Sequence, residues 1–314
     1  MKPPTSFDDL PVLGKLPPAE VIAKLREMDD MVTADALQEA LEDRPLRAQS
    51  FAGGTRSWWP FEDKPWQHTA HAFGYIAPSP RPGSEAPLPI RHAGNIAPDP
   101  SLKNARVIIT LDRLRVAGYP GSGTHRVLFD FSAQNQVPGT PEHLHFNATY
   151  RAREGEQVGM IGYPLFVGLN VGSEGLSFKC FTVNVKNDAD EAFLGFLDSD
   201  VFKNGLQLAA AAQPAIAPLS AMAEGLTRAI AKRNRNVPVQ DFYMGLDFGA
   251  VPTGARLAVG TYLAVQIPET LVAVWNWDGW EYDPRNGQIV DGDHATKLIP
   301  YNYVAFGVRR YEGA

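Results

Sequence analysis

The chain has 314 residues, of which 44% are hydrophobic and 20% charged, and its formal net charge at pH 7 is −6. This composition is typical of a globular protein with a full core, and the acidic balance argues against general nucleic-acid binding. The single cysteine excludes an intrachain disulfide, no apolar run of about 18 residues is present to span a membrane, and the N-terminus lacks the apolar core of a signal peptide. We therefore expect a cytoplasmic protein, with peripheral membrane contact only as a lesser alternative.

Residues 1–101 predict an N-terminal arm. Two short amphipathic helices are expected in it, one opened by Pro18 and Glu20 and the other capped by Thr33. From 51 to 101 the chain is rich in proline and tryptophan, which predicts an irregular loop. Because short helices cannot bury their apolar faces alone, we expect the arm to dock either on its own domain or on a neighbouring subunit.

From about residue 102 the apolar residues alternate, as they do in strands with one buried face. The pattern shifts phase after Leu111, which indicates a β-bulge near Asp112. About eight to ten such strands, with 271–277 among them, predict a mainly β fold. We expect an antiparallel β-sandwich of C2, immunoglobulin or jelly-roll type over 102–314. A helical segment at about 190–235 is inserted into it, with a helix starting near Ser220.

Two histidines at alternate positions of a predicted strand are the first candidate site. His143 and His145 point to the same face, and with a third ligand, either His125 from a neighbouring strand or Glu142, they could bind a metal ion such as zinc. The sequence shows no spacing that ties the three together. The alternative is a pair of exposed or hydrogen-bonded histidines on the polar face of the strand.

Three acidic groups in predicted loops are the second candidate site. Calcium prefers carboxylate oxygens, and loops at the end of a sandwich can supply them, as in C2-type domains. The alternative is that the acidic residues cap the helices that follow them. The candidate calcium ligands are Asp188, Asp190, Asp198, Asp200, Asp291 and Asp293.

Six tryptophans are the third candidate site. Aromatic side chains are common anchors at protein interfaces, although they also pack in cores. The candidate interaction residues are Trp58, Trp59, Trp66, Trp275, Trp277 and Trp280.

Motifs for nucleophilic catalysis or phosphate binding are absent from the sequence. There is no Gly-x-Ser-x-Gly elbow or Gly-x-x-x-x-Gly-Lys loop, and Cys180 lies within a predicted strand, where cysteine is usually a small buried hydrophobe. We therefore expect a non-enzymatic interaction or structural protein without a cofactor. It would form a homo-oligomer or bind a protein partner through its arm and aromatic surfaces. A calcium- or lipid-binding C2-like module and a metal-dependent enzyme using His143 and His145 are the alternatives.

Overall fold

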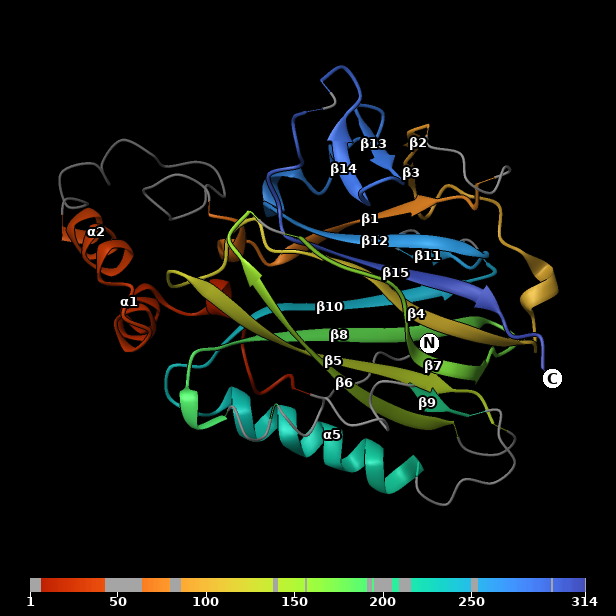
Figure 1. The fold of residues 1–314 in the computed structure, drawn as a ribbon, viewed down its shortest axis with the longest axis horizontal. Helices are drawn as coiled ribbons and strands as arrows, with labels where there is room; N and C mark the ends of the chain where they lie inside the picture. Colours follow the sequence, from red (N-terminus) through yellow and green to blue (C-terminus); the bar gives the residue numbers. More distant parts are fainter. Residues whose placement is uncertain are drawn as a thin grey trace.

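The computed structural model describes residues 7–42, 64–79, 86–137, 141–155, 157–190, 194, 205–208, 216–249, 254–294 and 296–313. The fold is mainly β and is consistent with a β-sandwich, which confirms the predicted class (Figure 1). Two large sheets pack face to face, and their inner faces share one core. Phe306 of one sheet meets Phe178 of the other, with ring centroids 4.4 Å apart.

The first sheet has seven strands in the order β3-β1-β12-β15-β4-β7-β9. All of its pairings are antiparallel except the one between β7 and β9. Its strands are β1 (Ala70–Ile76), β3 (Arg91–His92), β4 (Arg106–Arg115), β7 (Gln157–Asn170), β9 (Leu206–Gln207), β12 (Gly260–Ile267) and β15 (Tyr303–Arg310). The predicted bulge is confirmed, because the register of β4 against both neighbours shifts between Leu111 and Arg113.

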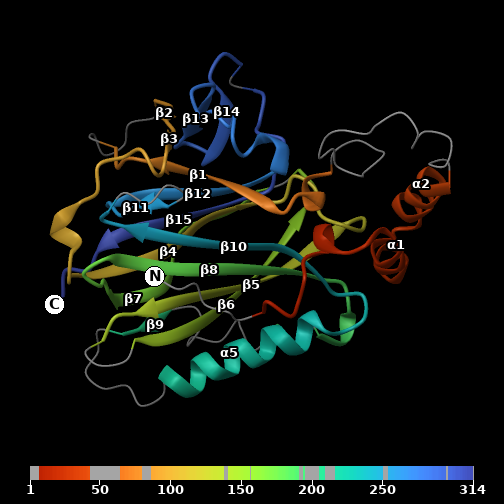
Figure 2. The same ribbon diagram turned by 180° about the vertical axis from the view of Figure 1, so that it is seen from behind.

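The second sheet has five strands in the order β11-β10-β8-β5-β6, and a further sheet has three, in the order β14-β13-β2. The five are β5 (Thr124–Asn135), β6 (Glu142–Arg153), β8 (Gly175–Val185), β10 (Val237–Asp247) and β11 (Ala255–Arg256). The three are β2 (Leu88–Pro89), β13 (Trp280–Asp283) and β14 (Gln288–Asp291). Strand β8 is buried along its whole length, because the other sheet covers one face and further chain covers the other. Seen from behind, the strands of the two large sheets overlap, as those of two stacked layers do (Figure 2).

Three α-helices lie in the described part of the chain: α1 (Pro18–Glu27), α2 (Met31–Glu42) and α5 (Ile216–Ala231). The first begins at Pro18, as predicted, since the missing N–H of proline costs nothing in a first turn. Helix α5 begins four residues before the predicted Ser220, with Pro218 tolerated in its first turn. It lies along the outer face of the five-stranded sheet, whereas α1 and α2 stand at one end of the sandwich (Figure 1).

Three segments differ from their predicted structure. Leu206 and Gln207, expected in the helical insert, form strand β9 of the seven-stranded sheet. Residues 70–92, expected in the arm, contribute β1 and β3 to the seven-stranded sheet and β2 to the small one, so the sandwich extends into the expected arm. Residues 271–277, expected as a strand, complete the 3-10 helix Glu269–Leu271 and continue as a turn at 272–274 and irregular chain. Val272 and Val274 in this run are exposed, whereas Leu271, Trp275 and Trp277 pack on the small core.

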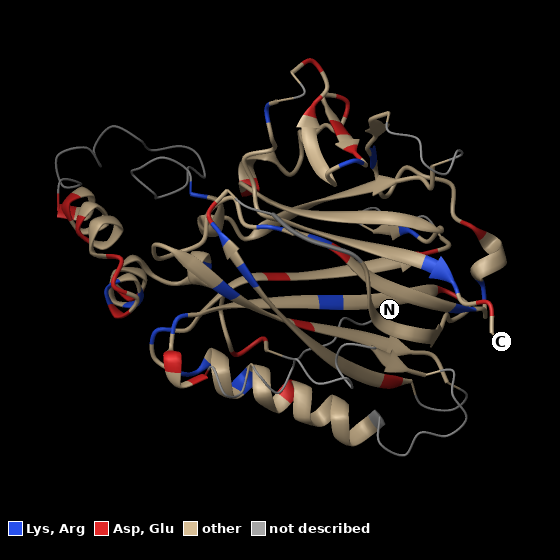
Figure 3. Ribbon diagram, viewed as in Figure 1, with Lys and Arg blue, Asp and Glu red and all other residues tan. Residues whose placement is uncertain are grey.

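Charged side chains are sparse along most of the strands and more frequent on the helices and connecting loops (Figure 3). No helix among the described residues is long and apolar enough to cross a membrane.

Candidate functional site

The outer face of the five-stranded sheet carries a row of polar side chains beneath α5. Register places Asp130 of β5 between Asn147 of β6 and Phe181 of β8. Two residues further along β5, Ser132 lies between His145 and Lys179. Residues two apart on a strand point to the same face, so Asp130, His145, Phe181 and Lys179 share the covered outer face.

Asp130 and His145 form a buried acid–base pair. Oδ1 of Asp130 lies 2.8 Å from Nδ1 of His145, and the hydroxyl of Thr227 on α5 donates to Oδ2 over 3.0 Å. The two residues are 1% and 4% exposed. Burial opposes the charged form of His145, but the hydrogen bond and charge of Asp130, together with the charge of Glu224, outweigh it and raise the pKa of His145.

Helix α5 is fixed to β6 by hydrogen bonds on either side of this pair. The backbone N–H of His145 donates to Oγ of Ser220 over 2.7 Å, and the side chain of Asn147 donates to the carbonyl of Ala223 over 2.9 Å. On the next turn Glu224 places a carboxylate oxygen 3.9 Å from Nε2 of His145. The helix therefore covers the acid–base pair with its own polar atoms.

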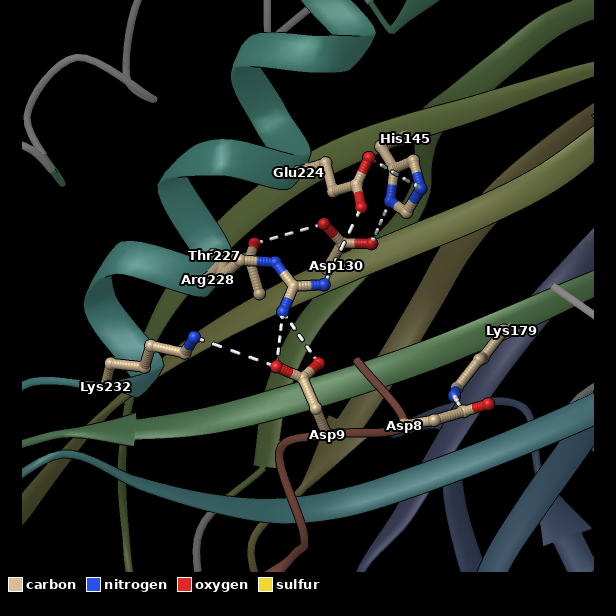
Figure 4. A network of polar contacts seen from close by, with 9 residues as sticks. All are labelled: Asp8, Asp9, Asp130, His145, Lys179, Glu224, Thr227, Arg228 and Lys232. Carbon is tan, nitrogen blue, oxygen red and sulfur yellow. Dashed lines mark hydrogen bonds and ion pairs between the residues drawn. The ribbon is translucent and has the colours of Figure 1, made fainter. Parts of the chain in front are cut away.

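Residues 7–16, which we call the strap, cover the rest of the cluster (Figure 4). Arg228 donates to both carboxylate oxygens of Asp9, over 2.7 and 2.8 Å, and Lys232 lies 3.7 Å from the same carboxylate. The hydrogen bond from Arg228 lowers the pKa of Asp9. The ammonium group of Lys179 on β8 lies 2.9 Å from Asp8. The strap is thus held to both the helix and the sheet.

Phe7 fills the space between these ion pairs. It is 1% exposed, its ring stacks on Phe181 with centroids 4.8 Å apart, and its edge meets the ring of His145 at 5.7 Å. The guanidinium carbon of Arg228 lies 5.5 Å from the centroid of Phe7. Because Phe7 and α5 enclose the imidazole, a substrate would reach His145 only after the strap or the helix had moved.

The structure places the three predicted zinc ligands apart. His143 and His145 share a strand face, with His143 exposed. His125 lies seven residues before Ser132, the β5 partner of His145, which is about 23 Å along a strand. Burial lowers the pKa of His125 to about 4, and its ring lies 5.8 Å from that of Tyr119. Within the described ranges, no group of three or more His, Cys, Asp or Glu side chains could hold a metal ion.

Three of the predicted calcium ligands lie in ion pairs or hydrogen bonds with the protein. Asp190 is buried against Arg233 and accepts a hydrogen bond from Asn236 over 2.6 Å. Asp188 accepts from Arg126 over 2.6 Å.

The third of these, Asp291, accepts from Lys297 over 3.0 Å and from the backbone N–H of Asp293 over 3.0 Å. Asp198 and Asp200 lie outside the described residues.

The tryptophans divide between core and partly exposed positions. Trp66 and Trp277 are each 2% exposed. Trp275 and Trp280 are half-buried against the small core around Trp277. Trp58 and Trp59 lie outside the described residues.

A pocket of about 830 Å³ opens beside the C-terminal end of β10. Phe73, Met244 and Phe248 give it an apolar wall, and Glu174 and Asp247 lie among its polar lining residues. Burial raises the pKa of Asp247, and the negative charge of Glu174 adds to the rise. The described residues that line this pocket include none of the Asp130–His145 cluster.

No family model, curated protein or solved structure matches this chain. Sequence reasoning selected His145 but missed Asp130 and the strap. The available signal for the strap was the triplet Phe7-Asp8-Asp9, an aromatic residue followed by two acids near the N-terminus.

Proposed function

We propose that this is a non-enzymatic interaction protein that assembles with a second copy of itself through its N-terminal arm. The observation that carries the proposal is the position of α2, which stands away from the sandwich (Figure 1), together with the exposure of its apolar side chains. Val32 is 84% exposed and Met31 is 49% exposed, side by side at the start of this helix. Burial of adjacent exposed apolar residues is a driving force for association.

The rest of the arm supports this proposal because it anchors α2. Asp29 forms an ion pair with Arg235, and Asp30 accepts a hydrogen bond from the backbone N–H of Gly121 over 3.0 Å. Helix α2 is tied back to α1, where Arg26 reaches Asp35 over 3.1 Å, and the two helices bury Leu25 and Leu37. A rigidly held helix that exposes apolar residues loses little conformational freedom when a partner binds.

The test is the solution mass of the full chain over a range of concentrations, by light scattering after size exclusion. We expect an assembly in the wild type and a shift to monomer in M31E/V32E, because a charge in a dry interface costs binding energy. M222E is the matched control, since Met222 on α5 is 41% exposed and lies outside the arm. A wild-type monomer at every concentration, or equal effects of the two variants, would contradict the proposal.

A further inference from the structure

Residues 7–9 are bound to the sandwich in the manner of a peptide ligand. Three consecutive side chains each contact a separate part of one site on the sandwich and α5, which we call the socket. Phe7 lies against Phe181, His145 and Arg228, whereas Asp8 meets Lys179 and Asp9 meets Arg228 and Lys232. The socket consists of Phe181, His145, Lys179, Arg228 and Lys232.

The charges of strap and socket are complementary. Lys179, Arg228 and Lys232 bring three cations to one site in a protein whose formal net charge is −6. The body also places Asp241 3.2 Å from Lys179 and Glu224 3.9 Å from Arg228. The two carboxylates of the strap bring further negative charge to these cations. An aromatic residue followed by two acids is therefore the chemistry that this socket recognises.

The backbone of Phe7 indicates that the socket determines its conformation. Its φ is +68°, in the left-handed region that bulky residues rarely adopt. Such a conformation persists only where the surroundings fix it, and it is common at clamps and binding sites. Here the surroundings are the stack on Phe181 and the ion pairs of the next two residues.

The connection from the strap to α1 has the features of a hinge. Leu16 and Pro17 are extended, with ψ near 150°, and Pro18 begins the helix. A proline restricts the residue before it to extended conformations and cannot donate a hydrogen bond. The strap therefore joins α1 through a short extended linker, and short linkers of this kind favour exchange of a segment between copies.

We propose that the strap of one copy fills the socket of a second copy, so that two chains assemble by reciprocal exchange of residues 7–16. Every contact described above forms equally well within one chain or between two, and only the hinge changes. This inference rests on the proposed self-assembly and names the segment that is exchanged. It adds a second contact to the one made by α2.

A charge-swapped pair of full-length variants tests the exchange. In D9K, the reversed strap opposes its own cationic socket, whereas in R228E/K232E the acidic strap opposes a reversed socket. In a 1:1 mixture each strap matches the socket of the other chain. We expect the mixture to form a heterodimer at least about tenfold more tightly than either variant associates alone. Light scattering and native mass spectrometry give the mass and the composition.

The triple variant D9K/R228E/K232E is the control, because it restores opposite charges within one chain and shows that the reversed pair folds. Circular dichroism of all four proteins checks their folding. If the wild type assembles but the mixture contains only the two separate species, exchange is overturned while self-assembly stands. If the wild type, the triple variant and the mixture are all monomeric, both proposals fail. A heterodimer in the mixture beside a monomeric wild type would also overturn the proposal, because exchange would then occur only where the charges have been reversed.

Discussion

At the scale of single residues, the polar cluster shows what spacing reveals and what it does not. The two-residue interval between His143 and His145 was enough to put them on one face of a strand. It could not show that Asp130, 15 residues earlier, accepts a hydrogen bond from His145. That contact depends on the register of the β5–β6 hairpin and on the layer above it. The same layer buries His145 and leaves His143 exposed.

The raised pKa of His145 predicts a pH dependence of stability. When the pKa of a histidine is higher in the folded state than in the unfolded state, its protonation stabilises the fold. This contribution is complete at a pH below the unfolded-state pKa of about 6.5, and it is lost as the pH rises through the folded-state pKa. At pH 6 we expect H145Q to have a free energy of unfolding about 2 kcal/mol below that of the wild type. As the pH rises above 6, the stability of H145Q should decrease less steeply than that of the wild type. Urea unfolding between pH 5.5 and 8.5 measures both. H143Q, at an exposed position on β6, is the control, and equal pH slopes in H145Q and wild type would contradict the prediction.

At the scale of elements, periodicity predicted most strands and the helix near Ser220, but not which of them pack together. The apolar residues Met222, Ala223, Leu226 and Ile230 recur at helical spacing along α5. Ala223 and Ile230 are buried on the sheet, Leu226 is partly buried, and Met222 is exposed. The small side chain of Ala223 brings the helix close enough for Asn147 to reach its carbonyl. Helical spacing therefore predicts the buried face of α5 to within about one residue. The sheet on which the helix packs determines which side chains lie at the centre of that face.

Enlarging Ala223 therefore tests how closely α5 packs on β6. A leucine here would add volume where the helix touches the sheet, and we expect A223L to lower the free energy of unfolding by about 2 kcal/mol. M222L, one residue away on the exposed side, should change it by less than about 0.5 kcal/mol. Urea unfolding at pH 6 compares the two variants. Similar values for both would mean that α5 is not docked as the structure shows.

At the scale of the whole molecule, the seven-stranded sheet serves two cores. Alternate residues of β12 and β15 face the sandwich interior on one side and the small three-stranded sheet on the other. The sequence showed the apolar alternation of these strands. It could not show that the outer face is also covered, because that cover brings β2 together with β13 and β14, which lie far from β2 along the chain.

Mutation of Trp277, in the core between the seven-stranded sheet and the small sheet, tests whether the two cores unfold together. Trp277 packs so closely on β1 that a Cβ added at Gly74 would lie 3.0 Å from its ring. We expect W277A to cost about 4 kcal/mol, because it leaves a large cavity. The shared sheet couples the cores, so wild type and W277A should each unfold in one transition, with far- and near-ultraviolet circular dichroism giving the same midpoint. W280A, at a half-buried position of the same core, should cost less. Two separate transitions in W277A would show that the small sheet unfolds independently of the sandwich.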